Sequence, residues 1–589
     1  MKMVKSLVLG STAALFAMGG AQAADLPVKA KAVEYVRICS LYGAGFFYIP
    51  GTDTCIKLGG YFRGDLNIHG GFSDAPFWSG DGGVQDRYVN QYNNYARIAL
   101  TTDTRTATEY GVVRTFSQLD INYGTIGNSS SINVGSSIEP GSLGGQIAGT
   151  TQTGTLFPEY LLLQFAGFTF GKSASAYASP WHGFPGNNTA YLVGGYDSVT
   201  GINNVQYTWQ FGNGVSATIG VDDSSAAGFN RTQLFNATLI GNPFSTTVNN
   251  SLTLGTPAAL TSPVQSACAM GGYGASSSLC TVVGTAYSGA FVPDFVGNVR
   301  VDQAWGLFQI SGAIHDVSPG YWASANTFNA STLLGGNNLI NTEISGHPDS
   351  KFGGAVMAAL QIKNLPTGPG DDIKLDASYG VGATKYILGT AAQLGGSFYM
   401  TKGGATSSGT MAIGAITDGV YGGWLTPLQA GVQLTRGWGF RGAFNHNWDP
   451  YWSTSLFGGI ARISYNQTAK DLWCASYGGT LANGLALPTS NNGAPLAGGH
   501  PMTPTPGTGY SCDPGFTMSQ IGLVTRWTPV KNLTFSAEAL YTYLKTNMTG
   551  IASGTLTSTF PTVQGTNVGF FQYGNVGTAS LNLRVQRNF

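Results

Sequence analysis

Few residue patterns in this sequence could carry chemistry, and the most suggestive one lies in the wrong structural context. Gly437-x-Gly439-x-x-Gly442 has the glycine spacing of a dinucleotide-binding turn, but such a turn connects a strand to a helix. Here residues 440–448 continue a predicted strand, so we expect these glycines to relieve crowding or to form a bulge within a sheet. The sequence contains no P-loop and no G-x-S-x-G nucleophile elbow.

The histidines do not form a metal-binding pattern either. His69, His182, His315, His347, His446 and His500 are scattered without an i, i+4 pair, the spacing by which one helix offers two ligands. No C-x-x-C or paired Cys/His spacing is present. The sequence predicts no catalytic residues, no metal and no cofactor.

Charged residues on the polar faces of strands are more informative. In Ile373–Ala383 the apolar Ile373, Leu375 and Tyr379 alternate with polar residues, a period of two that predicts a half-buried strand. In a wide barrel the charges on such faces would line a water-filled lumen. The predicted pore-lining set holds nine basic and five acidic residues: Arg63, Asp65, Arg97, Arg114, Asp120, Arg300, Asp302, Lys374, Asp376, Arg441, Arg462, Arg526, Glu538 and Arg584.

Sixteen segments read as strands that position these charges. They cover 56–69, 92–105, 108–123, 157–165, 168–178, 204–212, 215–222, 297–303, 307–316, 351–363, 372–388, 432–448, 453–465, 519–527, 532–545 and 576–589. Short connections alternate with long ones rich in Gly, Ser, Thr, Asn and Pro. The pattern predicts an all-β fold: a transmembrane antiparallel β-barrel of sixteen strands with long extracellular loops and short periplasmic turns.

The composition agrees with a barrel that spans a membrane. Of 589 residues, 86 are Gly and only 10% are charged, against about 25% in ordinary soluble domains. No later run approaches the roughly 20 apolar residues of a membrane-spanning helix. A closed antiparallel sheet pairs all its backbone N–H and C=O groups and so can span a membrane without such a run. The predicted partner of its outer surface is outer-membrane lipid. The equal counts of 28 basic and 28 acidic residues argue against nucleic acid as a partner.

The beginning of the chain reads as an export signal. Residues 1–23 combine Lys2 and Lys5, an apolar stretch and the small-x-small sequence Ala21–Ala23. We expect residues 1–23 to be a cleaved signal peptide, residues 24–55 to be a periplasmic segment and residues 56–589 to be the barrel with its loops. The last strand ends on Phe589 and resembles the assembly signal of outer-membrane barrels.

The six cysteines lie as three local pairs: Cys39 with Cys55, Cys268 with Cys280, and Cys474 with Cys512. An even number in an exported chain favours disulfides. Six cysteines allow 15 connectivities, so the nearest-neighbour pairing is one hypothesis among these.

Residues 178–203 form the third long connection. In many outer-membrane barrels the third long loop folds into the lumen, so this segment is the predicted constriction loop. It contains Trp181, His182, Tyr191, Tyr196 and Asp197. Its aromatic residues either offer a surface to sugars or pack the loop against itself. Asp197 is its only acid, so weak charge selection is expected there.

Several stretches resemble the alphaproteobacterial general porins of the Brucella and Bradyrhizobium type. They include 32–39, 43–55 and 59–63, with Cys39 and Cys55, then 164–171, 299–306 and 583–589. The resemblance implies a sixteen-stranded outer-membrane barrel that passes small hydrophilic solutes passively and assembles as a homotrimer. The sequence departs from the family in long, weakly charged inserts at 223–296, 389–431 and 466–518.

These features together predict a passive diffusion channel without catalytic chemistry. A solute-selective channel and a barrel-anchored adhesin remain alternatives, the latter because of the large loops. An enzyme on a barrel platform would need a Ser/His or acidic cluster on one rim, and no sequence-local cluster exists.

Overall fold

The computed structural model describes fourteen stretches of the chain: residues 37–69, 92–125, 152–189, 192–196, 200–225, 231–237, 286–322, 346–389, 397–402, 409–422, 430–478, 503–504, 511–556 and 567–589. The predicted signal peptide, Tyr191, Asp197, Cys268 and Cys280 lie outside these residues.

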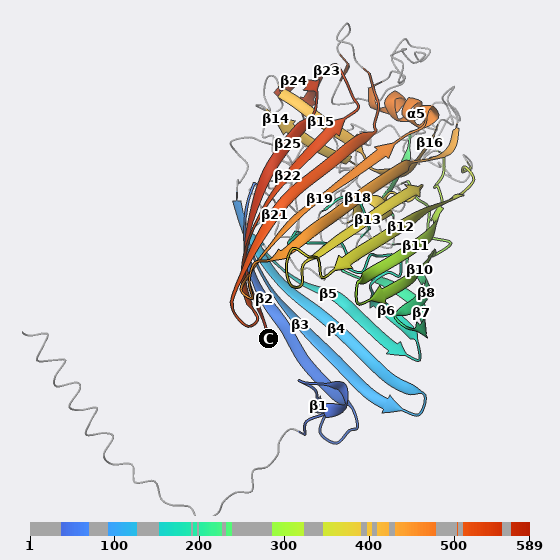
Figure 1. Cartoon of the computed structure of the whole chain (residues 1–589). Helices are drawn as coiled ribbons and strands as arrows, with labels where there is room; N and C mark the ends of the chain where they lie inside the picture. The colour runs from blue at the N-terminus through green and yellow to red at the C-terminus, as the bar shows by residue number, and fades with distance from the viewer. Residues whose placement is uncertain are drawn as a thin grey trace, which may run out of the picture.

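Sixteen antiparallel strands form a closed barrel, as the sequence predicts (Figure 1). They are β2 (Cys55–Ile68), β3 (Tyr92–Thr108), β4 (Gly111–Thr125), β5 (Gln152–Phe165), β6 (Phe168–Ser173), β7 (Ile202–Gly212), β8 (Val215–Asp222), β10 (Asp294–Gln303), β11 (Gly306–Val317), β12 (Lys351–Lys363), β13 (Asp372–Val381), β18 (Arg436–Asn447), β19 (Trp452–Ser464), β21 (Phe516–Val530), β22 (Leu533–Thr546) and β25 (Val576–Asn588).

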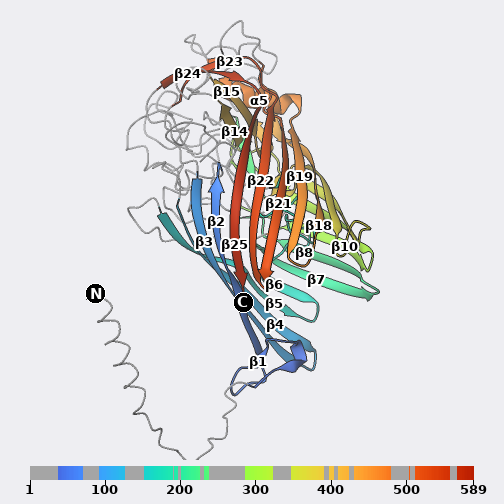
Figure 2. The same cartoon turned by 60° about the vertical axis from the view of Figure 1, so that its left-hand side comes forward.

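The last strand closes the barrel against the first. β25 pairs with β2 from Leu581 opposite Ile68 to Asn588 opposite Tyr61, and the two strands lie side by side in Figure 2. Phe589 extends the seam, because its backbone N–H and C=O both bond to Gly60. Closure leaves no unpaired edge, which hydrocarbon requires of a sheet.

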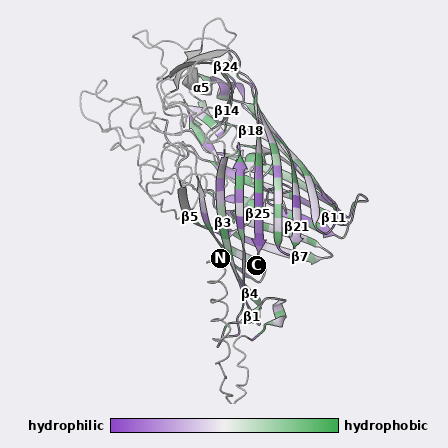
Figure 3. Cartoon of the chain, turned by 90° about the vertical axis from the view of Figure 1, so that its left-hand side faces the viewer, coloured by the Kyte–Doolittle hydropathy of each residue, from purple (hydrophilic) through white to green (hydrophobic). Residues whose placement is uncertain are grey.

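Apolar and polar residues alternate along the strands (Figure 3). On β22 the exposed Phe535 and Tyr541 point outward, whereas Glu538 and Thr542 are buried within the barrel. The exposed apolar side chains cover the outer wall, as lipid contact demands.

A small N-terminal unit lies at the end with the short turns. It contains the 3-10 helix η1 (Ser40–Tyr42) and β1 (Phe47–Tyr48), which pairs with β2. The Cys39–Cys55 disulfide and Phe46 form its small core. β2, β3 and β4 extend toward this unit below the other strands (Figure 1).

In the described part of the chain, two further sheets and two helices lie at the opposite end. One sheet contains β14 (Ser397–Lys402), β15 (Gly409–Ala415), β24 (Asn567–Tyr573), β23 (Ile551–Leu556) and β20 (Thr503–Pro504), and the other contains β17 (Ala430–Leu434), β16 (Thr417–Gly422) and β9 (Gln233–Asn236). With α4 (Lys385–Leu388) and α5 (Gln467–Gly478) they bury a large apolar cluster against the inner wall, including Trp473 and Phe516. No helix in the described stretches is both long and apolar enough to cross a membrane.

Three predicted strands differ in extent from their sequence pattern: two end early and one is divided. The segment 372–388 stops at Val381, because Gly382 adopts a φ of +68° and the chain then turns into α4. The segment 432–448 is divided between β17 and β18, and 168–178 stops at Ser173. In each case the remaining apolar residues pack inside the barrel mouth.

Candidate functional site

The inner wall carries most of the charged residues that the sequence assigns to it. Thirteen of the fourteen predicted pore-lining residues alternate with outward-facing apolar residues and so point to the interior: Arg63, Asp65, Arg97, Arg114, Asp120, Arg300, Asp302, Lys374, Asp376, Arg441, Arg526, Glu538 and Arg584.

Arg462 is the exception, and its predicted lumen position is wrong. It shares the outer face of β19 with Leu456, which is 50% exposed, and pairs across the sheet with Trp438, which is 42% exposed. The inner face of β19 here carries Ala461 and Ile463, which pack against the apolar cluster at the mouth. Both faces of the strand are therefore partly apolar, and alternation alone misassigned it. An outer arginine near a strand end can extend to lipid headgroups.

Loop L3, defined as the described residues 174–189, 192–196 and 200–201 between β6 and β7, lies along the inner wall. Trp181 donates from Nε1 to Asp376 at 2.6 Å. Arg441 donates from Nε to the same carboxylate at 2.8 and 3.0 Å and from its Nη atoms to the carbonyls of Gly195 and Tyr196. Arg441 and Asp376 are almost completely buried. They anchor the loop and do not border open space.

A second set of bonds holds the middle of L3 to β21, β22 and β25. Thr189 donates its hydroxyl to Glu538 at 2.8 Å, and the Asn188 N–H also bonds to this carboxylate. Arg526 donates to the Gly186 carbonyl at 2.6 Å, and Arg584 donates to the Asn188 carbonyl at 3.0 Å. L3 is thus held by side chains from strands that are far apart in sequence.

Glycines of the wall let L3 approach closely. A Cβ on Gly439 would lie 2.5 Å from the Gly194 carbonyl oxygen, and one on Gly459 would lie 2.1 Å from that of Val193. The pattern Gly437-x-Gly439-x-x-Gly442 lies within β18. This confirms the prediction that the glycines relieve crowding in a sheet.

The aromatic residues of L3 pack instead of forming an open surface. Tyr196 stacks on Tyr386 of α4 with ring centroids 5.0 Å apart, and Tyr177 meets the same ring edge-on at 4.6 Å. Trp181 and Tyr196 are buried. Burial raises the pKa values of the Tyr177 and Tyr386 hydroxyls. Tyr386 therefore stays protonated and donates to Asp294 at 2.6 Å.

His182, the remaining described member of the predicted constriction set, adopts a φ of +48° within L3. Its backbone N–H bonds to the Ser179 carbonyl at 2.9 Å, as in a local turn.

Charged side chains on β2 to β5 form a different part of the wall. Arg97 lies 3.0 Å from Asp120 and 3.6 Å from Glu159. Asp65 lies between Arg63 at 3.1 Å and Arg584 at 2.7 Å. Glu159 was missed from the sequence because β4 and β5 shift register beside Leu119, so simple alternation fails there.

A buried polar network lies at the end of the barrel opposite the short turns. His315 contacts Asp294 through Nδ1 at 2.7 Å and Tyr287 through Nε2 at 3.1 Å. Tyr287 in turn donates to Asp418 at 3.0 Å. Within the described residues, no three His, Cys, Asp or Glu side chains are grouped as metal ligands.

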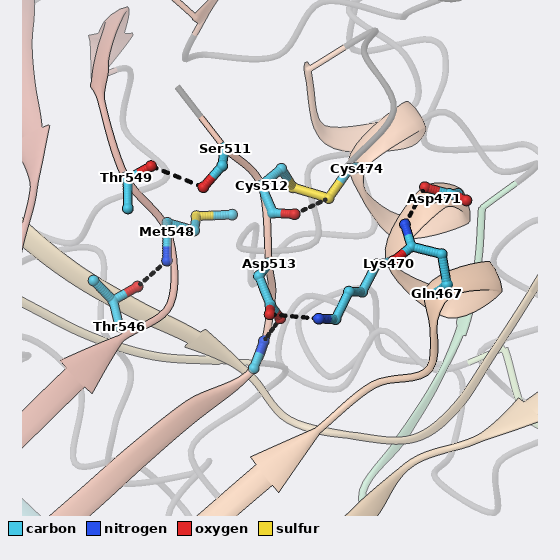
Figure 4. The surroundings of a disulfide bond; sticks show 11 residues. Gln467, Lys470, Asp471, Cys474, Ser511, Cys512, Asp513, Thr546, Met548 and Thr549 are labelled. Carbon is cyan, nitrogen blue, oxygen red and sulfur yellow. Dashed lines mark hydrogen bonds and ion pairs between the residues drawn. A yellow bond between two sulfur atoms is a disulfide. The ribbon is translucent and has the colours of Figure 1, made fainter. Parts of the chain in front are cut away.

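A disulfide fastens one long insert to the mouth. Cys474 of α5 is bonded to Cys512, just before β21, and Lys470 contacts Asp513 at 2.6 Å beside it (Figure 4). The predicted pairs Cys39–Cys55 and Cys474–Cys512 are both confirmed.

Comparison with known proteins gives a consistent family. A model of the Porin subfamily matches residues 25–568. Porin Omp2b of Brucella suis biovar 1 (strain 1330) is 36% identical over 227 residues, and Porin Omp2b of Brucella canis is 37% identical over 231 residues. Each alignment covers 37% of this chain, and the chain spans only 54% of the length of either relative.

Solved structures are similar at much lower identity. The outer membrane channel DcaP of Acinetobacter baumannii is 12% identical with a TM-score of 0.47, and the match covers 92% of this chain and 99% of that one. Pseudomonas putida OprB is 12% identical with a TM-score of 0.37, covering 91% and 94%. The family match over most of the chain places the protein in the outer membrane and shows that it belongs to the Porin subfamily.

Proposed function

We propose that this chain forms a passive, water-filled channel through which small hydrophilic molecules and ions diffuse across the outer membrane. The observation that carries this proposal is a closed sixteen-strand barrel whose inner wall bears thirteen of the predicted charges. Barrels of 16 to 18 strands are too wide for wall side chains to fill. L3 narrows the lumen because wall residues hold it inside the barrel.

The charged residues then act as the wall of the pore and not as catalysts. Ion pairs such as Arg97 with Asp120 hold fixed charges in place, and fixed charges near a constriction set which ions pass. We propose no enzymatic activity, in keeping with the family.

We also propose that the channel assembles as a homotrimer, on the strength of the family alone. Chemical cross-linking of the purified protein in detergent should give a species of three chains. A monomer under all detergent conditions would refute this part of the proposal.

Planar lipid bilayers test the channel directly. In 1 M KCl, addition of purified protein should give stepwise, nearly ohmic conductance increases, grouped in threes if the trimer forms. Protein that is folded by circular dichroism but opens no channels would refute the proposal. Saturable block of the current by one sugar or anion would instead favour a solute-selective channel.

A loop deletion distinguishes the adhesin alternative from the channel. Deleting 480–501 spares α5, Cys474 and Cys512, so the disulfide and the mouth cluster stay intact. Loss of cell binding with unchanged conductance would favour an adhesin.

A further inference from the structure

Two ion groups at the end with the short turns share one composition, a single aspartate between two basic side chains. In the first group Asp103 of β3 contacts Arg105 and Arg114. Arg105 lies 3.0 Å and Arg114 also 3.0 Å from its Oδ2 atom. Arg114 donates in addition to Gln164 at 2.9 Å. The guanidinium groups are therefore fixed near the turn between β3 and β4.

The second group lies on the far side of the barrel. Asp302 of β10 contacts Arg300 at 2.9 Å and Lys363 of β12 also at 2.9 Å. Five strands, β4 to β8, separate β3 from β10 in the closed sheet. The two groups therefore face the same mouth from nearly opposite walls.

Each group keeps one uncompensated positive charge, since two cations share one carboxylate. Among the described residues, no second acid lies within ion-pair distance of these four cations. The side chains are accessible to water, with exposed fractions of 29% and 31% for Arg105 and Arg114, and 36% and 33% for Arg300 and Lys363. The paired aspartates cannot attract further cations effectively, whereas the excess charge can attract anions.

At the opposite end of the barrel the ion pairs among the described residues are balanced or acidic: Lys470 pairs with one acid, Asp513, and His315 lies between Asp294 and Asp418. Residues 238–285 and 479–502, which belong to two of the long inserts, contain no Asp, Glu, Lys or Arg.

We propose that the end with the short turns is an anion-attracting vestibule, so that the channel prefers small anions to cations and conducts unequally in the two directions. This inference rests on the proposed channel function. Rings of Arg and Lys favour anions in other pores, and a charged, narrow entrance concentrates ions of the opposite sign. One charge in water about 8 Å away changes ion occupancy about two- to threefold.

The test is the reversal potential in a KCl gradient, measured with the full-length protein in planar bilayers. The parent channel should favour chloride over potassium about two- to threefold at 0.01–0.1 M salt. The preference and the unequal currents should fade toward 1 M KCl, where the screening length falls to about 3 Å.

A double variant assigns the effect to these groups. Arg114→Gln with Lys363→Gln leaves each aspartate one cation, so neither carboxylate becomes unpaired and folding should be preserved. Its chloride preference should be lost. The matched control, Arg436→Gln with Arg462→Gln, removes two charges from the outer face and should keep the preference.

The outcomes separate the inference from the channel proposal. A conducting channel without anion preference overturns the inference alone, as does a double variant that keeps the parental preference. A folded protein that never conducts overturns the proposed function. Heat-dependent mobility on gels checks that every variant still forms a barrel.

Discussion

At the scale of single residues, the same ion-pair chemistry has different roles according to burial. Arg441 and Asp376 are buried beneath L3, where they bond to each other and Arg441 also donates to the backbone of the loop. Arg300 and Lys363 at the mouth stay accessible to water around Asp302. Buried charges must be paired, so the first pair determines loop position, while the second group is available to ions.

Arg441→Ala should therefore loosen L3. The change leaves Asp376 buried with only part of its donors, which typically costs about 3–5 kcal/mol. We expect lower thermal stability and noisier channel currents. Arg436→Ala, on the outer face of the same strand, is the control and should change neither property. Equal behaviour of the two variants would contradict the anchoring role.

Asp371, in the turn between β12 and β13, makes the stability of the fold depend on pH. Burial disfavours its charged form, but hydrogen bonds from the Thr367 hydroxyl, the Asn447 N–H and His446 outweigh this and hold its pKa at about 2. A depressed pKa stabilises the fold above the ordinary value of 3.8, and this stabilisation is lost as the pH falls through about 2.

Asp371→Asn should consequently unfold at a lower temperature than the parent at pH 7. The difference should shrink between pH 4 and pH 2, within the window set by these values. Melting curves of the detergent-solubilised protein provide the measurement. The exposed Asp349→Asn serves as the control, and a parent–variant difference that is constant with pH would contradict the linkage.

At the scale of elements, the position of L3 depends on glycines in the wall, which have no side chain, as much as on hydrogen bonds. β18 and β19 present Gly439 and Gly459 to the backbone of Val193 and Gly194. The strands thus form a smooth surface on which the loop lies, and the charged anchors on either side fix its direction.

Gly439→Ala should displace L3, because the new methyl group would lie 2.5 Å from a backbone oxygen that cannot rotate away. Single-channel conductance should shift from the parental value. Gly312→Ala, whose Cβ would meet nothing within 4 Å, is the matched control. Conductance unchanged in both variants would show that L3 does not narrow the pore.

The Cys474–Cys512 disulfide should stabilise the mouth without being needed for the barrel. It closes a loop with a sequence separation of 38 residues, for which chain entropy predicts about 4 kcal/mol. Replacing both cysteines by serine should expose α5 to proteases while the strands remain protected. Complete digestion of the barrel in this variant would contradict the assignment.

The barrel strands could be predicted from the sequence, but the packing at the mouth of the barrel could not. Period-two alternation located all sixteen barrel strands because lipid and interior impose opposite demands on successive residues. It failed at Arg462 and beyond Val381, where apolar residues face inward against α4, α5 and two small sheets. Whether Trp181 and Tyr196 face water or pack was open from the sequence, since it depends on partners such as Asp376 and Tyr386 that are distant along the chain.

At the scale of the whole molecule, closure and filling divide the barrel into two parts. β25 and β2 close the sheet, the apolar cluster occupies one mouth, and exposed ion groups occupy the other. L3 lies between them along β13, β18, β21 and β22. Any diffusion path runs past this loop.

Conductance in a planar lipid bilayer tests the central claim most directly. In 1 M KCl, purified, folded protein added to one side should produce discrete, nearly ohmic current steps that persist at low voltage. Folded protein that inserts into the bilayer and leaves the current at its baseline would contradict the account.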